Sequence, residues 1–257
     1  MNKPALTDEL IDLARKAGDV ILRIYEGEFG HQHKPDHSPV TEADVAAERV
    51  ILDGLAQLTP DIPVVAEEQA AAGGLPTGAA AKFWLVDPLD GTKEFIARNG
   101  EFTVNIALIV DGVPVLGVVH LPVLGVTYAG ADGRAERKTG VAPAEAIHAR
   151  STPASGAIMT ISRSHASKEL AKAEEMGVPI AGTVVAGSSL KFCRVAEGAA
   201  DIYPRFGPTM EWDTAAGQAV LENAGGSVRT IDGAPLRYGK PGLRNPHFIA
   251  RGIQRPA

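Results

Sequence analysis

Three consecutive strand patterns in the middle of the chain restrict the fold more than any other feature of the sequence. The runs FTVNIALIV (102–110), VPVLGVVHL (113–121) and VLGVTYA (123–129) follow one another with almost no spacer. The first two are separated only by Asp111-Gly112, a dipeptide typical of tight hairpin turns. The sequence therefore predicts an antiparallel meander in this part of the chain.

Helical patterns precede the meander, and strands alternate with helices after it. Residues 6–24 carry apolar side chains at spacings of three and four, as an amphipathic helix does, and a second such pattern begins at Thr41. Beyond the weakly patterned stretch 131–155, strands are expected at 157–161, 183–186 and 199–203 and helices at 166–175, 188–197 and 213–224. This order predicts an α+β fold of layered sheets and helices, with an N-terminal half at 1–140 and a C-terminal half at 150–257 in one compact unit.

Charge and composition limit the kinds of partner. The 257 residues carry a formal net charge of −6, so no broad surface for DNA or RNA is expected, and a small anionic ligand would need local cations. Cys193 is the only cysteine and cannot form an internal disulfide, which favours a reducing compartment such as the cytoplasm. No apolar run reaches the roughly 18 residues of a membrane span, and the N-terminus has no hydrophobic signal region.

The stretch WLVDPLDGTKEF (84–95) places two carboxylates at the end of an apolar strand. Pro88 restricts Asp87 to extended backbone, so the strand should continue up to that carboxylate. Gly91 permits a tight reversal after Asp90, before a short helix begins. Both acids should therefore lie at the same end of the strand.

The two aspartates and the groups next to them could bind a metal and a phosphate. Asp87, Asp90 and the carbonyl of Leu89 are hard oxygen ligands of the kind that Mg²⁺ prefers. Thr92 can cap the short helix, and the Gly91 and Thr92 amides at its N-terminus would favour a phosphate. The structural alternative, in which both aspartates only bind turn amides, is about equally compatible with this motif alone.

Three further acidic positions bear on the same hypothesis. Glu67-Glu68 ends the preceding short strand, and carboxylates at the ends of adjacent strands would repel one another unless a cation lies among them; a solvated loop acid is the alternative for Glu67. Asp213 precedes a helical run and is also a favoured N-cap residue, a role that still leaves an oxygen for a metal. Asp44 follows Thr41 at the spacing of a capping box, so both capping and metal binding are open for it.

These motifs resemble the inositol monophosphatase superfamily of metal-dependent, lithium-sensitive phosphatases. DPLDGTKEF, the upstream Glu67-Glu68 and the downstream WDTAAG carry the resemblance. Within the superfamily, longer stretches are similar to the CysQ-type 3′(2′),5′-bisphosphate nucleotidases, namely 84–109, SRSH (162–165), GSSLKFCRVAEG (187–198) and YPRFGPTMEWDTAAG (203–217). The resemblance covers most of the chain and is weakest at 69–82 and 131–155.

The resemblance implies a fold and a metal site. The fold would be a layered α-β-α-β-α sandwich, and the cofactor would be two or three Mg²⁺ ions per site. The implied metal ligands are Glu67, Asp87, the Leu89 carbonyl, Asp90 and Asp213, with Asp44 near a further, weaker metal position. Glu67 and Thr92 would orient the attacking water, while Asp90 would take part in catalysis through the metals.

A second set of residues is expected to bind the substrate. A nucleotide with two phosphates needs a second anion site away from the metals, and Arg or Lys can supply it. Taken singly, each of the cations is also compatible with a surface charge or a helix cap. The set consists of Arg163, Ser164, His165, Lys191 and Arg205, of Gly187, Ser188 and Ser189 near a flat base, and of Gly91, Thr92 and Asp213.

The implied activity is hydrolysis of adenosine 3′,5′-bisphosphate to AMP and phosphate, which belongs to sulfur assimilation, with the 5′-phosphosulfate analogue as a further substrate. Inositol-1-phosphate hydrolysis is the nearest alternative, because the same metal site would serve it. A phosphatase with a nucleophilic aspartate usually has Asp-x-Asp, whereas the spacing here is Asp-x-x-Asp. A non-catalytic metal-binding or nucleotide-binding protein is the remaining alternative. The resemblance leaves open the oligomeric state and a peripheral association with the cytoplasmic face of the inner membrane.

Overall fold

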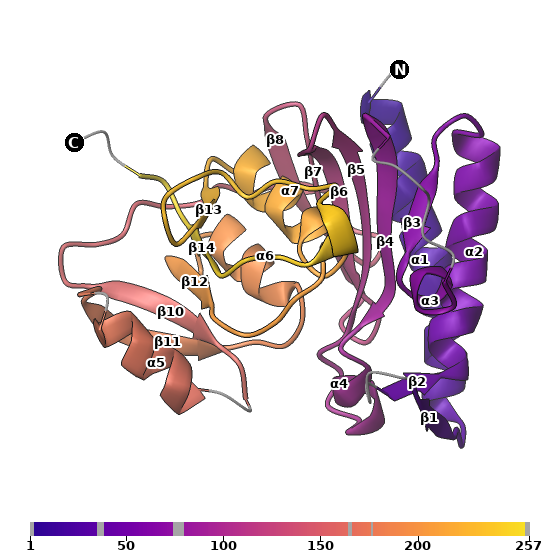
Figure 1. The fold of residues 1–257 in the computed structure, drawn as a ribbon, viewed down its shortest axis with the longest axis horizontal. Coiled ribbons are helices and arrows are strands. Elements are labelled where there is room, and N and C mark those ends of the chain that lie inside the picture. Colours follow the sequence, from indigo (N-terminus) through magenta and orange to yellow (C-terminus); the bar gives the residue numbers. More distant parts are fainter. Residues whose placement is uncertain (1–2, 35–38, 74–79, 164–165, 176, 255–257) are drawn as a thin grey trace.

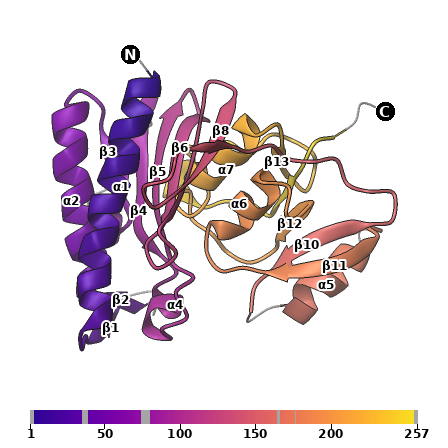
Figure 2. The ribbon, with the colours of Figure 1, turned by 180° about the vertical axis from the view of Figure 1, so that it is seen from behind.

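Two large sheets and three helical layers alternate through the molecule (Figure 1). The computed structural model describes residues 3–34, 39–73, 80–163, 166–175 and 177–254. Helices α1 and α2 form one outer layer, followed by a seven-stranded sheet, by α6 and α7, by a five-stranded sheet and by α5. The view from behind shows the same succession (Figure 2). The expected layered α-β-α-β-α fold is confirmed.

The seven-stranded sheet contains the predicted meander. From β4 to β9 each strand pairs antiparallel with the next one along the chain, whereas β3 pairs parallel with β4. From β5 onward, connections of a few residues explain this order, because strands joined by short turns favour pairing with the nearest strand. Its strands are, in spatial order, β3 (Val64–Ala66), β4 (Lys82–Asp90), β5 (Thr103–Val110), β6 (Val113–Leu121), β7 (Val126–Ala131), β8 (Arg134–Thr139) and β9 (Glu145–Ala146).

Helices α1 (Lys3–Glu26) and α2 (Glu42–Leu58) cover the outer face of this sheet. The apolar stripe of α1, including Leu10 and Ile21, is buried against β6 and its neighbours. Burial of such a stripe removes roughly 25 cal/mol of unfavourable hydration per Å² of apolar surface. The helix expected from 6–24 is therefore confirmed, and its polar face is left to solvent.

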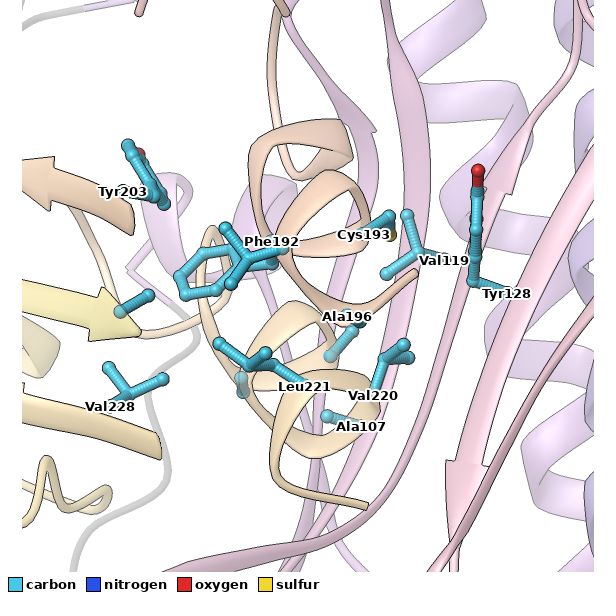
Figure 3. Close-up of a cluster of buried hydrophobic side chains, with 14 of the residues drawn as sticks. Ala107, Val119, Tyr128, Phe192, Cys193, Ala196, Tyr203, Val220, Leu221 and Val228 are labelled. Atoms are coloured by element: carbon cyan, nitrogen blue, oxygen red, sulfur yellow. The ribbon is translucent and has the colours of Figure 1, made fainter. Parts of the chain in front are cut away.

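Helices α6 (Leu190–Ala196) and α7 (Ala215–Asn223) lie between the two sheets. Figure 3 shows their apolar side chains meeting those of both sheets, with Phe192 and Leu221 toward one sheet and Val220 toward the other. Close approach of α7 to the seven-stranded sheet depends on Gly117, because a Cβ atom there would lie 2.5 Å from the carbonyl oxygen of Ala216. The middle helix layer thus joins the two sheets through one continuous core.

The five-stranded sheet carries the second half of the chain. Its spatial order is β11 (Ile180–Val185), β10 (Ala157–Ile161), β12 (Ile202–Arg205), β14 (Phe248–Arg251) and β13 (Ser227–Thr230). Strand β10 pairs parallel with β11 and β12, as expected where strands alternate with helices, and the remaining pairs are antiparallel. Helix α5 (Ala166–Glu175) covers its outer face. The expected division into halves at 140–150 stays a prediction.

The remaining elements are short, and two of them follow the strands β3 and β4. They are β1 (His31–His33), β2 (Pro39–Thr41), α3 (Glu67–Ala71), α4 (Thr92–Ile96) and a 3₁₀ turn at Pro241–Leu243. Within the described ranges, no helix combines the length and the apolar character that a membrane crossing requires.

Candidate active site

Asp87 and Asp90 stand on either side of a β-bulge in β4. Asp87 pairs with Asn105, and Asp90 pairs with Thr103. The two aspartates are three residues apart on β4, whereas their partners are only two residues apart on β5. In a regular strand, side chains three residues apart point to opposite faces, and the extra residue of a bulge cancels this alternation. Pro88, which has no N–H to give to a ladder, lies inside the bulge. The strand therefore continues past Asp87 to Asp90, and the reversal expected at Gly91 is confirmed, with a φ of 97° there.

Glu67 lies beside Asp87 because β3 and β4 run parallel. Ala66 is opposite Val86 in the register, so the next residue on each strand is an acid. Asp213, which comes from the segment before α7, joins them, and one carboxylate oxygen of each of these three acids lies within 4.8 Å of the others. We call Asp44, Glu67, Asp87, Asp90 and Asp213 the acidic cluster. The expectation that adjacent strands end in facing acids is confirmed.

Asp213 does not have the N-cap role that was open for it. The N-cap position of α7 is Thr214, and the Asp213 carboxylate instead accepts a hydrogen bond from the backbone N–H of Met210 at 2.8 Å. Its second carboxylate oxygen has no hydrogen bond within the described part of the chain. The side chain is therefore fixed on one side and available to a ligand on the other.

Asp44 has the capping role that was open for it, and its role near a metal stays a prediction. Thr41 caps α2, and Asp44 accepts hydrogen bonds from the Thr41 amide at 2.8 Å and hydroxyl at 2.6 Å, which is a capping box. Its other oxygen accepts a hydrogen bond from the Thr92 hydroxyl at 3.0 Å. Thr92 is the first residue of α4 and does not cap it, since Gly91 occupies the N-cap position, so the expected cap is wrong. The Leu89 carbonyl accepts a longer bond of 3.5 Å from the same hydroxyl.

Burial and mutual repulsion make the acidic cluster hard to ionise without a cation. Desolvation and the charge of Glu67 raise the pKa of Asp87, while desolvation and the charge of Asp90 raise the pKa of Asp213. Desolvation raises the pKa of Asp90 to about 6, although the ammonium of Lys191 opposes the shift. Hard oxygen donors that repel one another at this distance are suited to a divalent cation.

Lys34 supplies a positive charge that the sequence did not reveal. Its ammonium forms ion pairs with Glu67 at 2.7 Å and Glu68 at 2.6 Å. These contacts raise the pKa of Lys34 despite its burial, and desolvation raises the pKa of Glu68 to about 7. Nothing in the local sequence around Lys34 indicates this pairing, because it joins residues more than 30 positions apart.

Glu48 is a second residue that sequence reasoning missed. Its buried carboxylate accepts hydrogen bonds from the Glu68 amide at 2.8 Å and the Gln69 amide at 3.1 Å, at the start of α3. It thereby fixes the segment that carries Glu67. A signal existed, since Glu48 follows Asp44 by four residues and so lies on the same face of α2.

A cavity of about 310 Å³ opens next to the acidic cluster. Its walls combine acids and cations from both halves of the chain. Seven of the residues expected at the substrate site line it, namely Gly91, Arg163, Gly187, Ser188, Lys191, Arg205 and Asp213, and the expected metal ligand Asp90 lines it as well, together with Thr209 and Tyr203. Ser164 and His165 lie outside the described residues.

The cations at this cavity differ in how far they are already paired. Arg163 is 55% exposed and its guanidinium binds the Glu101 carboxylate at 2.5 and 3.2 Å. Lys191 is buried, and among the described residues its ammonium has only a 3.4 Å bond to the Ala186 carbonyl and a contact over the Tyr203 ring. Desolvation lowers its pKa. Arg205 Nε is buried without a hydrogen bond in the described structure. Lys191 and Arg205 therefore have donors left for an anion.

Ser188 and Ser189 are adjacent but face different surroundings. Ser188 lines the cavity, and its hydroxyl donates to the backbone carbonyls of Asp90 at 2.8 Å or Glu101 at 3.0 Å. Ser189 is only 1% exposed. Ser189 therefore does not offer its side chain to a ligand in the cavity.

Residues 3–253 match the Inositol monophosphatase family. The chain belongs to the inositol monophosphatase family. The match spans both sheets and every member of the acidic cluster, so the family relation covers the whole site.

Individual relatives carry a more specific name. The 3′(2′),5′-bisphosphate nucleotidase CysQ of Escherichia coli K12 is 49% identical over 248 residues, which are 95% of this chain and 98% of that protein. The crystal structure of CysQ from Bacteroides thetaiotaomicron superposes with a TM-score of 0.80 at 37% identity, covering 98% of both chains. An inositol monophosphatase from Anabaena superposes with a TM-score of 0.77 at 27% identity, covering 98% of this chain and 92% of that one.

Proposed function

We propose that this inositol monophosphatase family member is a magnesium-dependent phosphomonoesterase that hydrolyses adenosine 3′,5′-bisphosphate to AMP and phosphate. The observation that carries the proposal is the juxtaposition of the acidic cluster with Lys191 and Arg205 across one cavity. A substrate with two phosphates can place one at the acids with their metal and the other at the cations. Relatives about half identical to this chain bear the name of that activity.

The residues of the acidic cluster fit a hard divalent metal. All offer oxygen, and a cation among them relieves their mutual repulsion while they stay ionised. Glu67, Asp87, the Leu89 carbonyl, Asp90 and Asp213 would hold two magnesium ions, and Asp44 would lie near a third. When bound, magnesium supplies Lewis-acid chemistry, which polarises the phosphoryl group and lowers the pKa of a water.

The chain itself orients the reactants. Glu67 would accept a proton from the attacking water. For this role its carboxylate would have to give up the ion pair with Lys34. Thr92, whose hydroxyl donates to Asp44, would hold that water from the other side through its hydroxyl oxygen. The Gly91 and Thr92 amides would donate to the phosphate that is cleaved. These positions restrict the approach of water to one face of the phosphorus atom.

The second phosphate would bind at the opposite wall of the cavity. Lys191, Arg205 and the buried hydroxyl of Thr209 supply donors there, and Arg205 Nε and Thr209 Oγ1 have no partner in the described structure. Buried donors without a partner are costly, so a ligand that satisfies them binds selectively. Arg163 would bind this phosphate only after its ion pair with Glu101 is broken. A cytoplasmic location is also part of the proposal and stays a prediction.

The test compares substrates and one cavity variant. Purified protein is assayed for phosphate release from adenosine 3′,5′-bisphosphate, its 5′-phosphosulfate analogue, adenosine 3′-monophosphate and inositol 1-phosphate, with magnesium and with a chelator. We expect the bisphosphate to have the highest kcat/KM, and Lys191→Met to raise KM for it at least tenfold while KM for adenosine 3′-monophosphate, which lacks the second phosphate, is little affected. Equal loss for both substrates, or no release from the bisphosphate, would contradict the proposal.

Inositol-1-phosphate hydrolysis is the second candidate, because inositol monophosphatases share this fold at 27% identity. The same acids would serve it, but the cationic wall would have no second phosphate to bind. Turnover of inositol 1-phosphate that equals or exceeds that of the bisphosphate would favour this candidate.

A further inference from the structure

Ser189 occupies a helix N-cap position without capping the helix. It directly precedes α6, and its side chain makes no hydrogen bond to the first turn of that helix. Serine is among the favoured N-cap residues, and a capping bond typically stabilises the helix that it caps. The Ser189 hydroxyl must therefore have other partners that replace the capping bond.

The partners of the Ser189 hydroxyl come from three distant segments. It lies 3.2 Å from the Asp90 carboxylate on β4 and 2.9 Å from the backbone carbonyl of Asp213, and both groups are acceptors. It accepts a hydrogen bond from the amide of Asn105, on β5, at 3.0 Å. One hydroxyl thus links two members of the acidic cluster that are more than 120 residues apart in sequence.

Asn105 is itself held in one orientation. Its side-chain oxygen accepts a hydrogen bond from the Thr103 hydroxyl at 3.1 Å, which leaves the amide hydrogens directed at Ser189 and, at 3.5 Å, at Asp90. Thr103, Asn105 and Ser189 are all buried. A buried and fully bonded network of this kind has little freedom, so the positions of its members determine one another.

These hydrogen bonds also leave one carboxylate oxygen of each acid available to a metal. Ser189 binds Asp213 through the backbone carbonyl, and the Met210 amide takes one oxygen of the Asp213 carboxylate. At Asp90, both Ser189 and Asn105 approach the same oxygen, Oδ2. Each acid therefore keeps its other oxygen, Oδ1, outside this network.

We infer that Ser189, oriented by Asn105, is a positioning residue that holds Asp90 and Asp213 at the separation required for metal binding. The inference rests on the proposed function only in assuming that these acids bind magnesium. Groups that orient metal ligands in this way commonly change metal affinity 10-fold to 100-fold when they are removed.

The experiment measures metal binding directly, without substrate. Magnesium and manganese are titrated calorimetrically into wild type, Ser189→Ala, Asn105→Leu and the double variant. We expect each single variant to weaken binding about tenfold, and the double variant to be no weaker than either one, because both act through the same contact. Thr160→Val is the matched control, since it removes a buried hydroxyl on β10 that has no partner in the described structure.

Kinetic and thermal measurements separate positioning from a structural role. In active preparations, Ser189→Ala should lower kcat and require more magnesium for half-maximal rate, with KM for the bisphosphate at saturating magnesium within twofold of wild type. A lowered melting temperature with unchanged metal affinity would overturn the inference, as would additive effects in the double variant. If Ser189→Ala does not fold, Asn105→Leu provides the same test. Absent turnover of the bisphosphate by wild type, together with weakened metal binding by the variants, would overturn the proposed substrate and support the positioning role.

Discussion

Replacing Asp87 with asparagine tests whether the acidic cluster destabilises the metal-free protein. Asp87 is buried on β4, and its Oδ1 accepts a hydrogen bond from the Leu89 amide at 3.0 Å. Asparagine keeps the shape and this acceptor but removes the negative charge. Asp87→Asn should therefore isolate the electrostatic contribution from the packing contribution.

The expected change in stability follows from the distances between the carboxylates. Two like unit charges 4.8 Å apart repel by about 3.5 kcal/mol at an effective dielectric constant of about 20. Asp87 has two such neighbours, Glu67 and Asp213, but burial already raises the pKa of Asp87, so part of the repulsion is relieved by protonation. We expect Asp87→Asn to stabilise the metal-free protein by about 3 kcal/mol, which corresponds to about 6 °C in melting temperature for a chain of this size.

The assay is thermal or urea unfolding in chelator and in excess magnesium. Magnesium at 100 times its dissociation constant should stabilise wild type by about 2.7 kcal/mol and the variant far less. Asp201→Asn is the control, because Asp201 is also a fully buried carboxylate but is paired with Arg150 at 2.8 Å. It should destabilise the protein and leave the magnesium response unchanged. A destabilised metal-free Asp87→Asn protein, or one with the magnesium response of wild type, would refute the reasoning.

Two further predictions concern parts of the fold away from the acids. Burial lowers the pKa of His120 to about 4, so the unfolded chain takes up a proton below pH 6.5 while the folded chain does not, and stability falls as the pH drops from about 6.5 toward 4. Between pH 7 and pH 5 this loss should be about 2 kcal/mol in urea unfolding, and His120→Gln should lack it; an equal slope in both proteins would contradict the assignment. Gly117→Ala should destabilise the protein by about 2 kcal/mol, because the added Cβ meets the α7 backbone, and an unchanged melting temperature would show that α7 can move away.

Local patterns were enough to predict most elements of the fold. The Asp111-Gly112 turn and the apolar runs around it predicted the meander, since hairpin pairing involves neighbouring segments. The spacing of Thr41 and Asp44 predicted the capping box at the start of α2. The bulge at Pro88 was not predicted, because a bulge is defined by the partner strand as well as by its own sequence.

The candidate site depended more on tertiary structure. The sequence alone identified the acids as candidate ligands, because residue type and motif determine which chemistry a group can perform, and the family resemblance added Lys191 and Arg205 as candidate phosphate-binding residues. Only the folded chain decided that the Asp213 carboxylate binds the Met210 amide instead of capping α7, that Lys34 pairs with Glu67, and that Ser189 links two acids. Such contacts join segments tens of residues apart and depend on desolvation and charge at one buried place, quantities that arise from packing and have no counterpart in local periodicity.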